Sequence, residues 1–358
     1  MKKKNWLVIA SLLTLSVVIH FYSCNSISVE NYYSTGIYYY ISLILRSISG
    51  LFPFSIGDIL YGLIFLWLII KLIQLIRSLF HCQFKKKYLK NLSIKLISAL
   101  LSVYIIFNIL WGINYNRKGI AYQLGLKTND YTVEDLKHID QLLLQKVNES
   151  KMVLLQNKDS IQNKNELVNK SIQSYNEIAK HYPFLTYKKI AVKSSLWGWL
   201  GNYLGFTGYY NPFTGEAQVN TTVPKFLQPY ITCHEMAHQL GYAKEDEANF
   251  VGYLAASAST DTLFHYSVYL DLFVTCNRNL YVADSASAIS FSKQLLPQVR
   301  TDLKEWKIFI LQHNNPFQPL VEWLYGKYLQ NNQQPSGVLT YDEVTDLLIE
   351  YYKKTGKI

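Results

Sequence analysis

Residues 233–250 of the chain read CHEMAHQLGYAKEDEANF, and they contain the pattern His-Glu-x-x-His at His234, Glu235 and His238. Residues four apart on an α-helix differ by about 40° around its axis, so both imidazoles would point to the same side. On such a helix His234 and His238 can hold one Zn²⁺, while Glu235 serves as general base for a water molecule. The pattern predicts a helical zinc site, and the rest of the fold has to supply its surroundings.

The residues around the motif indicate where its helix begins and ends. Pro224 and Pro229 precede the motif, and Thr232 is suited to cap the N-terminus of the helix. Gly241 follows three residues after the second histidine, where a left-handed turn can end a helix. A second helix is expected to begin at Glu245.

A catalytic zinc site needs a third protein ligand and one open position. The predicted second helix opens with Glu245, Asp246 and Glu247, which would also complement the helix dipole. Glu245 is the favoured ligand, because Asn249 lies four residues later on the same face and can hydrogen-bond a ligating histidine. Glu247 is the alternative, although Val251 offers no such partner at that spacing.

Three further residues are weaker candidates. Tyr266 follows the second helix and could stabilise an oxyanion, with packing as the alternative role. Cys233 adjoins the first histidine but points about 100° away from it, which favours a small core residue over a ligand. Cys233 and Cys276 are compatible with either a disulfide or two free thiols.

The residues before the motif predict two helices followed by short strands. Thr132 and Asp135 have the form of a capping box at the start of the first helix, and the second is expected over residues 166–181. Aromatic residues interleaved with glycines over 190–224 suit short strands and turns. Residues 216–220 read as a strand that could pair with an extended substrate.

The composition indicates a membrane protein, because 49% of the residues are hydrophobic and only 17% are charged. Segment Ile37–Phe54 is also apolar, but Arg46 at its centre indicates an interfacial or re-entrant piece. Trp111 and Tyr115 are expected at the membrane–water interface. Three segments reach the length of about 20 apolar residues needed to span a bilayer, namely Trp6–Tyr22, Ile59–Ile70 with its flanks, and Leu96–Ile113.

The distribution of charge predicts the orientation. Of the 35 Lys and Arg residues, 11 lie in residues 1–116 against Glu30 and Asp58 alone, which leaves 24 basic and 23 acidic residues in 117–358. The basic excess lies before the first span and between the second and third, so both clusters should face the cytoplasm. Residues from about 116 onward then emerge outside, and a basic nucleic-acid-binding domain is excluded. Four cysteines without a CxxC pair also exclude a disulfide-dense scaffold.

The run from His234 to Asn249 resembles the gluzincin metallopeptidases. In that family a Glu on the next helix is the third zinc ligand and an Asp or Asn follows it by four residues, which the resemblance assigns to Glu245 and Asn249. Only six residues separate His238 from Glu245, fewer than in typical gluzincins.

A wider resemblance is to a bacterial family of multi-pass membrane proteins of unassigned function with a zincin-like domain. Residues 50–54, 111–115, 208–217 and 233–250 carry this resemblance, which spans most of the chain. It implies a metallopeptidase-like protein tethered to the membrane.

The expected fold is an α-helical membrane anchor of about three transmembrane helices over residues 1–115, followed over 116–358 by a mainly helical α+β zincin-like domain with a small sheet. The expected function is zinc-dependent hydrolysis of protein or peptide substrates outside the cytoplasmic (inner) membrane. The alternative is a catalytically silent binding or scaffold protein, although Glu235 is a base that a structural zinc site does not need. An intramembrane protease is excluded, because the charged residues of 235–247 would be too costly in lipid.

This topology predicts the behaviour of phosphatase fusions. A phosphatase that is active only outside the cytoplasm should be active when fused after Asn116 and inactive when fused after Lys87. The reverse pattern would overturn the orientation.

Overall fold

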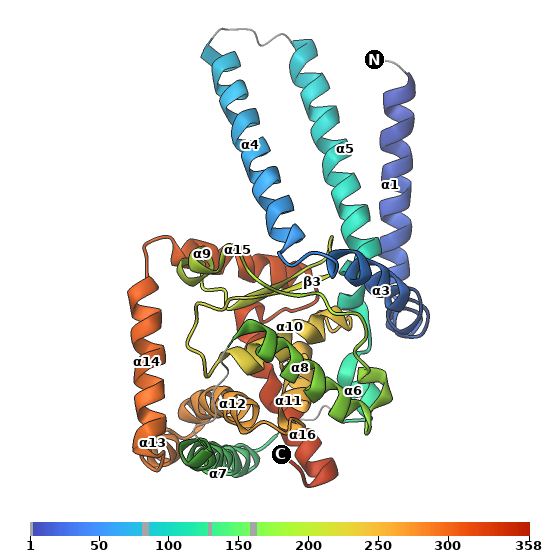
Figure 1. Cartoon of the computed structure of the whole chain (residues 1–358). Helices are drawn as coiled ribbons and strands as arrows, with labels where there is room; N and C mark the ends of the chain where they lie inside the picture. The colour runs from blue at the N-terminus through green and yellow to red at the C-terminus, as the bar shows by residue number, and fades with distance from the viewer. Residues whose placement is uncertain (1–2, 81–85, 128–130, 158–162) are drawn as a thin grey trace.

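The computed structural model describes residues 3–80, 86–127, 131–157 and 163–358, and it consists of three long helices above a mostly helical domain (Figure 1). The long helices are α1 (Lys3–Ser23), α4 (Ile56–Phe80) and α5 (Lys86–Leu110). Each contains an apolar window long enough to cross a membrane, over Trp6–Ser23, Ile56–Ser78 and Leu92–Leu110. The three expected spans are confirmed as apolar helices, and the last one ends three residues earlier than the sequence indicates.

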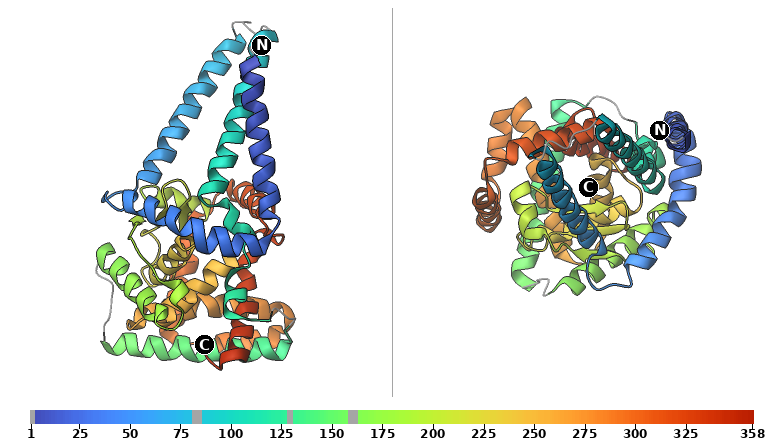
Figure 2. Two further views of the ribbon diagram at one scale, coloured as in Figure 1. Left: turned by 90° about the vertical axis from the view of Figure 1, so that its right-hand side faces the viewer. Right: turned by 90° about the horizontal axis from the view of Figure 1, so that it is seen from above.

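The segment around Arg46 lies across the foot of the long helices (Figure 2). It follows the short α2 (Ser26–Ser28) and consists of a π-helix, η1 (Val29–Ile37), that continues into α3 (Tyr38–Ser49). Ile44 and Ile48 are exposed on the outer side of α3, whereas Arg46 is buried towards the domain. A helix with one apolar outer face and one polar inner face is suited to an interface rather than to a span.

Two buried carboxylates attach the start of α4 to the domain. Glu216 accepts hydrogen bonds from the backbone N–H groups of Ile56 and Gly57, at 3.1 Å and 2.6 Å. Asp58 accepts one from the backbone N–H of Leu196 at 2.5 Å. Because the first N–H groups of a helix have no partner within the helix, a carboxylate there is stabilised and fixes the direction of α4.

A small sheet lies on the side of the domain nearest to the foot of α4 (Figure 1). Its strands are β1 (Val192–Ser194), β2 (Gly208–Asn211) and β3 (Glu216–Val219), in the order β1-β3-β2. β3 runs parallel to β1, with Ala217 opposite Val192, and antiparallel to β2, with Val219 opposite Gly208. The strand expected at 216–220 is confirmed, but α9 (Gly198–Leu204) is a helix where the sequence indicates only strands and turns.

Helices form the remaining layers, with α10 and α11 central and α7, α13 and α16 farthest from the apolar helices (Figure 1). Thr132 and Asp135 form the expected capping box, because Asp135 N–H donates to the Thr132 hydroxyl and Thr132 N–H to the Asp135 carboxylate. The helices are α6 (Gly119–Leu124), α7 (Val133–Asn157), α8 (Lys164–Ala179), α10 (Gln228–Gln239), α11 (Glu245–Ser257), α12 (Thr262–Ala283), α13 (Ser285–Lys293), α14 (Pro297–His313), α15 (Gln318–Asn331) and α16 (Val344–Thr355), with 3₁₀ turns η2 (Gly112–Asn116), η3 (Pro183–Leu185) and η4 (Gly337–Glu343).

A second apolar cluster joins the long helices to the domain. Trp111 and Tyr115 belong to it together with Tyr38 from α3 and Tyr210 from β2. Both residues were expected at the lipid interface, but the structure buries them to 5% and 3% exposure. The polar and aromatic side chains at the end of α5 therefore pack against the domain, and the boundary at residue 115 crosses a continuous core.

The cap expected at Thr232 is wrong, and the state of Cys233 and Cys276, which the sequence left open, is that of two thiols. α10 begins at Gln228, so Thr232 lies inside the helix, where its hydroxyl donates to the carbonyl of Gln228 at 2.7 Å and caps nothing. Cys233 and Cys276 are both free and buried, and Cys276 lies beside Thr345. Pro229 can stand in the first turn because the N–H that proline lacks has no helical partner there.

A buried carboxyl predicts that stability falls as pH rises. Asp140 on α7 is 0% exposed, and burial raises its pKa to about 7 against the single hydrogen bond from Asn277. Between about pH 4 and pH 7 the folded chain keeps a proton that the unfolded chain loses, which costs stability at about 1.4 kcal/mol per pKa unit. Asp140→Asn should therefore match the wild-type Tm near pH 4 and exceed it at pH 8. Parallel Tm profiles across this pH range would contradict the assignment.

Candidate metal centre

The His-Glu-x-x-His motif lies on α10, and a sharp turn follows it. α10 ends at Gln239, and Gly241 takes a φ of +89°, as expected from the sequence. A side chain at Gly241 would also come within 2.8 Å of the ring of Tyr38. Glycine is therefore required there both for the left-handed backbone and for the close approach of α3. The turn sends the chain back so that α11 begins at Glu245, beside the motif.

His234, His238 and Glu245 come together as the sequence predicts. Glu245 Oε2 lies 3.3 Å from His234 Nε2 and 3.5 Å from His238 Nε2. One ligand atom from each of the three residues lies within 4.8 Å of the others. Ligand atoms about 2.0–2.1 Å from a tetrahedral Zn²⁺ lie about 3.3–3.4 Å from one another. The spacing of the carboxylate from the two imidazoles fits one such ion.

The donor set also fits a metal chemically. Glu245 Oε2 is buried and has the two imidazoles as its polar neighbours, at distances longer than a good hydrogen bond. His238 Nδ1 donates to the carbonyl of Tyr242 at 2.7 Å, which leaves Nε2 facing the centre as the atom that would bind a metal once it loses its proton. Asn249 and His234 line the same cleft, but His234 Nδ1 has no hydrogen-bond partner among the described residues, so the expected hydrogen bond from Asn249 stays a prediction.

The carboxylate sets the charge of the cluster. Burial lowers the pKa of His234, whereas at His238 the carboxylate outweighs burial and raises the pKa to about 9. Burial also acts to raise the pKa of Glu245, but the two imidazoles hold it well below its usual range. Glu245 is thus an anion at neutral pH that faces the protonated His238, and a metal cation could take the place of that proton.

Glu235 faces a cavity of about 330 Å³ that His234, His238 and Glu245 also line. A Cβ added to Gly208 of β2 would lie 2.5 Å from Glu235 Oε1, so only glycine leaves room for this carboxylate. Burial raises the pKa of Glu235 to about 8, against the lowering effect of His238. Glu235 is therefore a carboxyl whose proton can be exchanged near neutral pH.

Residues distant in the sequence form the walls of this cavity, which we call the central cavity. Tyr61 comes from the start of α4, Phe107 comes from the last turn of α5, and Trp111 directly follows α5. Tyr325 on α15 donates a hydrogen bond to Glu245 Oε1 at 2.9 Å. The sequence carries no local signal for these residues, because none lies near the motif and tyrosine is common in this chain. Their positions bring the cavity to the foot of the apolar helices.

Two weaker candidates lie away from the centre. Tyr266 was the candidate oxyanion stabiliser, but its hydroxyl donates to Asp302 and Lys151 lies over its ring, 4.8 Å from the centroid. Glu247 packs against Gly119, with its carboxylate 3.8 Å from Lys244 Nζ. The geometry thus places Glu245 at the two histidines and leaves Glu247 outside the cluster.

The sheet also differs from the expected substrate-pairing role. β3 was expected to pair with an extended substrate, but it is the central strand and has partners on both sides. β2 is an edge strand, and its residues Gly208, Tyr209 and Tyr210 line the central cavity. A peptide that adds to this sheet at the cavity would therefore have to pair with β2.

Fold and site together define a helical protein with three apolar helices of membrane-spanning length and a buried cluster of two histidines and one carboxylate beside them. The chain belongs to the family described as "Protein of unknown function (DUF3810)", which matches residues 33–349. That range includes two of the long helices and nearly all of the domain. No curated protein and no solved structure matches the chain.

The cluster predicts a difference between two neighbouring glutamates. Glu245→Gln should lower Zn²⁺ affinity strongly, because it removes the charge between the imidazoles, while Glu247→Gln should change it little. Asn249→Ala should fall between them, since a hydrogen-bond partner of a ligand contributes about 10–100-fold. Zinc per chain, measured on the purified full-length protein with His234→Ala as the metal-free reference, checks the order. A loss of zinc in Glu247→Gln alone would show that the ligand assignment is wrong.

Proposed function

We propose that this protein is a membrane-anchored zinc metallopeptidase that hydrolyses protein or peptide substrates outside the cytoplasmic membrane. The observation that supports this most is the arrangement of Glu245 between His234 and His238, with the Glu235 carboxyl in the same cavity. A two-histidine, one-glutamate set leaves a fourth position open, which is typical of catalytic rather than structural zinc.

The residues of the chain divide the chemistry among them. His234, His238 and Glu245 would hold the zinc, which would polarise the scissile carbonyl, acidify a water molecule and favour the ionised form of Glu235. Glu235 takes a proton from the attacking water and can pass it to the leaving amine. Tyr325 holds the Glu245 carboxylate by its hydrogen bond to Oε1, which leaves Oε2 for the metal.

The position of the central cavity restricts the kind of substrate that can reach Glu235. Its wall includes Tyr61, Phe107 and Trp111 from the ends of the apolar helices, so a peptide bond can reach Glu235 only close to the membrane surface. The aromatic lining suits an extended peptide segment with apolar side chains. We therefore expect substrates that are themselves held at the membrane, cleaved in the segment next to it.

Glu235→Gln tests the proposed reaction. This variant should keep one zinc per chain, because the motif's glutamate is not a ligand, but lose cleavage by about 10²–10⁴-fold. Glu247→Gln is the matched control and should keep both zinc and cleavage. The readout is mass-spectrometric detection of fragments of an unfolded protein, offered free and attached to a lipid anchor in the same vesicles. If the wild type binds zinc and cuts neither substrate, the binding-protein alternative replaces the enzyme.

A further inference from the structure

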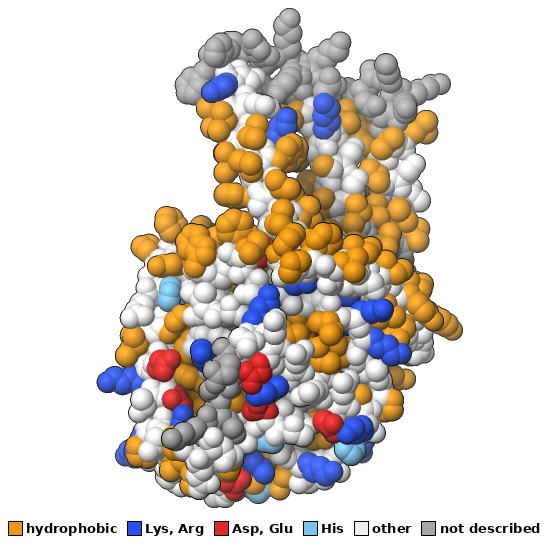
Figure 3. Space-filling model, in the orientation of Figure 1, with side chains coloured by type: hydrophobic (Ala, Val, Ile, Leu, Met, Phe, Trp, Pro, Cys, Tyr) orange, Lys and Arg blue, Asp and Glu red, His pale blue; other side chains and the backbone are white. Residues whose placement is uncertain are grey.

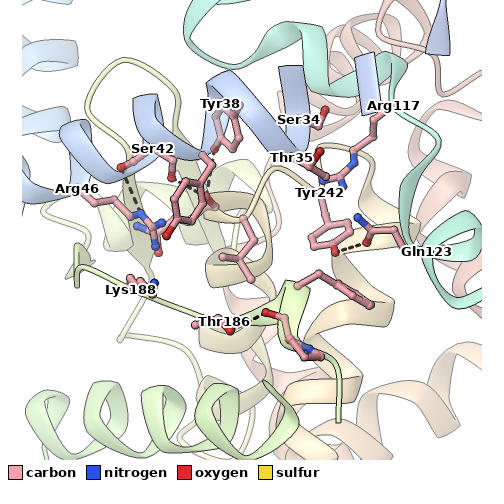
Figure 4. Close-up of a pocket in the computed structure, with 15 residues that line it drawn as sticks. Ser34, Thr35, Tyr38, Ser42, Arg46, Arg117, Gln123, Thr186, Lys188 and Tyr242 are labelled. Carbon is pink, nitrogen blue, oxygen red and sulfur yellow. Dashed lines mark hydrogen bonds between the residues drawn. The ribbon is translucent and has the colours of Figure 1, made fainter. Parts of the chain in front are cut away.

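A second cavity, of about 280 Å³, lies beneath α3 and shares no lining residue with the central cavity. Figure 4 shows its upper wall formed by Ser34, Tyr38, Ser42 and Arg46, with Arg117 and Gln123 at one side and Lys188 opposite. Three cationic side chains line it, and among the described residues no Asp or Glu does. We call it the α3 cavity.

Arg46 is the unusual member of this lining. Its side chain is 2% exposed, its Nε donates to the Ser42 carbonyl at 3.3 Å, and its guanidinium lies over the Tyr187 ring at 4.9 Å from the centroid. Nη1 has no hydrogen-bond partner, and Arg46 makes no ion pair within the described parts of the chain. A buried charge without a counter-ion is strongly unfavourable, so the position indicates that an anion completes it.

Arg117, in the same cavity, differs from Arg46 because its hydrogen-bond donors and its charge have partners within the protein. Its Nε and Nη2 donate to the two oxygens of Glu30 at 2.9 Å and 2.7 Å, and its Nη1 donates to the Gly241 carbonyl at 3.1 Å. Its charge is therefore neutralised within the protein. The excess positive charge of the cavity comes from Arg46 and from Lys188, which is exposed at its edge.

Hydroxyl groups also line the α3 cavity. Ser34 is 5% exposed, and its hydroxyl has no hydrogen-bond partner in the part of the chain that the structure describes. Thr35 and Thr186 also line the cavity, but their hydroxyls already donate to the carbonyls of Glu30 and Pro183. A guanidinium with a free N–H, an ammonium and the Ser34 hydroxyl are donors of the kind that proteins use to bind phosphate groups.

We propose that the α3 cavity binds a phosphate group at the membrane surface. α3 lies across the foot of the apolar helices, and the side facing away from the domain carries exposed Tyr40, Ile44 and Ile48. Apolar side chains gather on the long helices and on the adjoining edge of the domain (Figure 3). The same helix thus contacts acyl chains on one side and presents Arg46 to a phosphate on the other. A phospholipid headgroup and free phosphate offer the same chemistry.

This cavity is separate from the candidate metal centre, but α3 contacts the end of α10, the helix that carries the two histidines. Ser42 Oγ donates to the Gln239 carbonyl at 2.8 Å, and the Tyr38 hydroxyl donates to the same carbonyl at 3.2 Å. α3 therefore contacts the last turn of α10 but contributes none of the candidate zinc ligands. Binding at the α3 cavity is measurable on protein without metal, so the proposal stands or falls independently of the peptidase function.

The test uses the full-length protein in a maltoside detergent that contains no phosphate. Native mass spectrometry and thermal shift are recorded with phosphatidylglycerol, with inorganic phosphate, and with diacylglycerol as the phosphate-free lipid. We expect one phosphatidylglycerol per chain with a rise in Tm, and none of this with diacylglycerol. Stabilisation by inorganic phosphate as well would show that the phosphate alone is recognised, whereas its absence would show that the lipid is required.

Three variants locate the binding. Arg46→Gln should weaken phosphatidylglycerol binding by about 10–100-fold, as expected for loss of a charged hydrogen bond, and its Tm without lipid should not fall. Lys188→Gln, at an exposed position that does not endanger folding, should weaken binding by a smaller factor. Lys189→Gln removes the same charge one residue away, outside the cavity lining, and should bind as the wild type. The proposal would be overturned if all three variants bound phosphatidylglycerol as tightly as the wild type does. It would also be overturned if the wild type bound phosphatidylglycerol and diacylglycerol equally well.

Discussion

The carbonyl groups at the end of α10 are the constraint on which the candidate site depends. The last carbonyl groups of a helix have no hydrogen-bond donor within the helix. Here side chains from the N-terminal third of the chain donate hydrogen bonds to them. Trp111 Nε1 donates to the His238 carbonyl at 3.3 Å, Ser42 to Gln239 at 2.8 Å and Arg117 to Gly241 at 3.1 Å. These bonds hold the turn that returns the chain to Glu245. The membrane-proximal helices are thus part of the support of the candidate metal centre.

Buried charges are satisfied in different ways across this contact between anchor and domain. Glu30 is paired with Arg117, while Glu216 and Asp58 take backbone N–H groups at the start of α4 and of the segment before α9. Each arrangement provides hydrogen bonds that compensate for the water lost on burial. Glu245 Oε2 and Arg46 Nη1 are left without such partners, one at each of the two cavities. The same physical argument therefore points to a cation at one place and to an anion at the other.

Features that depend on local periodicity were predictable from the sequence. The spacing of His234 and His238 requires only a helix, and the three apolar helices follow from the length of apolar runs. The capping box of Thr132 and Asp135 is likewise a matter of residues three apart. Local spacing failed where the tertiary context prevailed, as at Thr232, which lies within a longer helix, and at Trp111, which packs on the domain instead of facing lipid.

Only the tertiary structure decided which side chains share a cavity. Tyr61, Trp111 and Tyr325 meet the motif across separations of more than 80 residues. Arg46 has no counter-ion among the described residues, although nothing in its neighbourhood along the chain distinguishes it from an interfacial arginine. The sequence by itself determined the helices, the spans and the two histidines, because these depend on contacts within a few residues. The third donor beside them, the aromatic walls and the unpaired arginine depend on how α3, α5, α11 and α15 pack against α10, and that packing is set by long-range contacts.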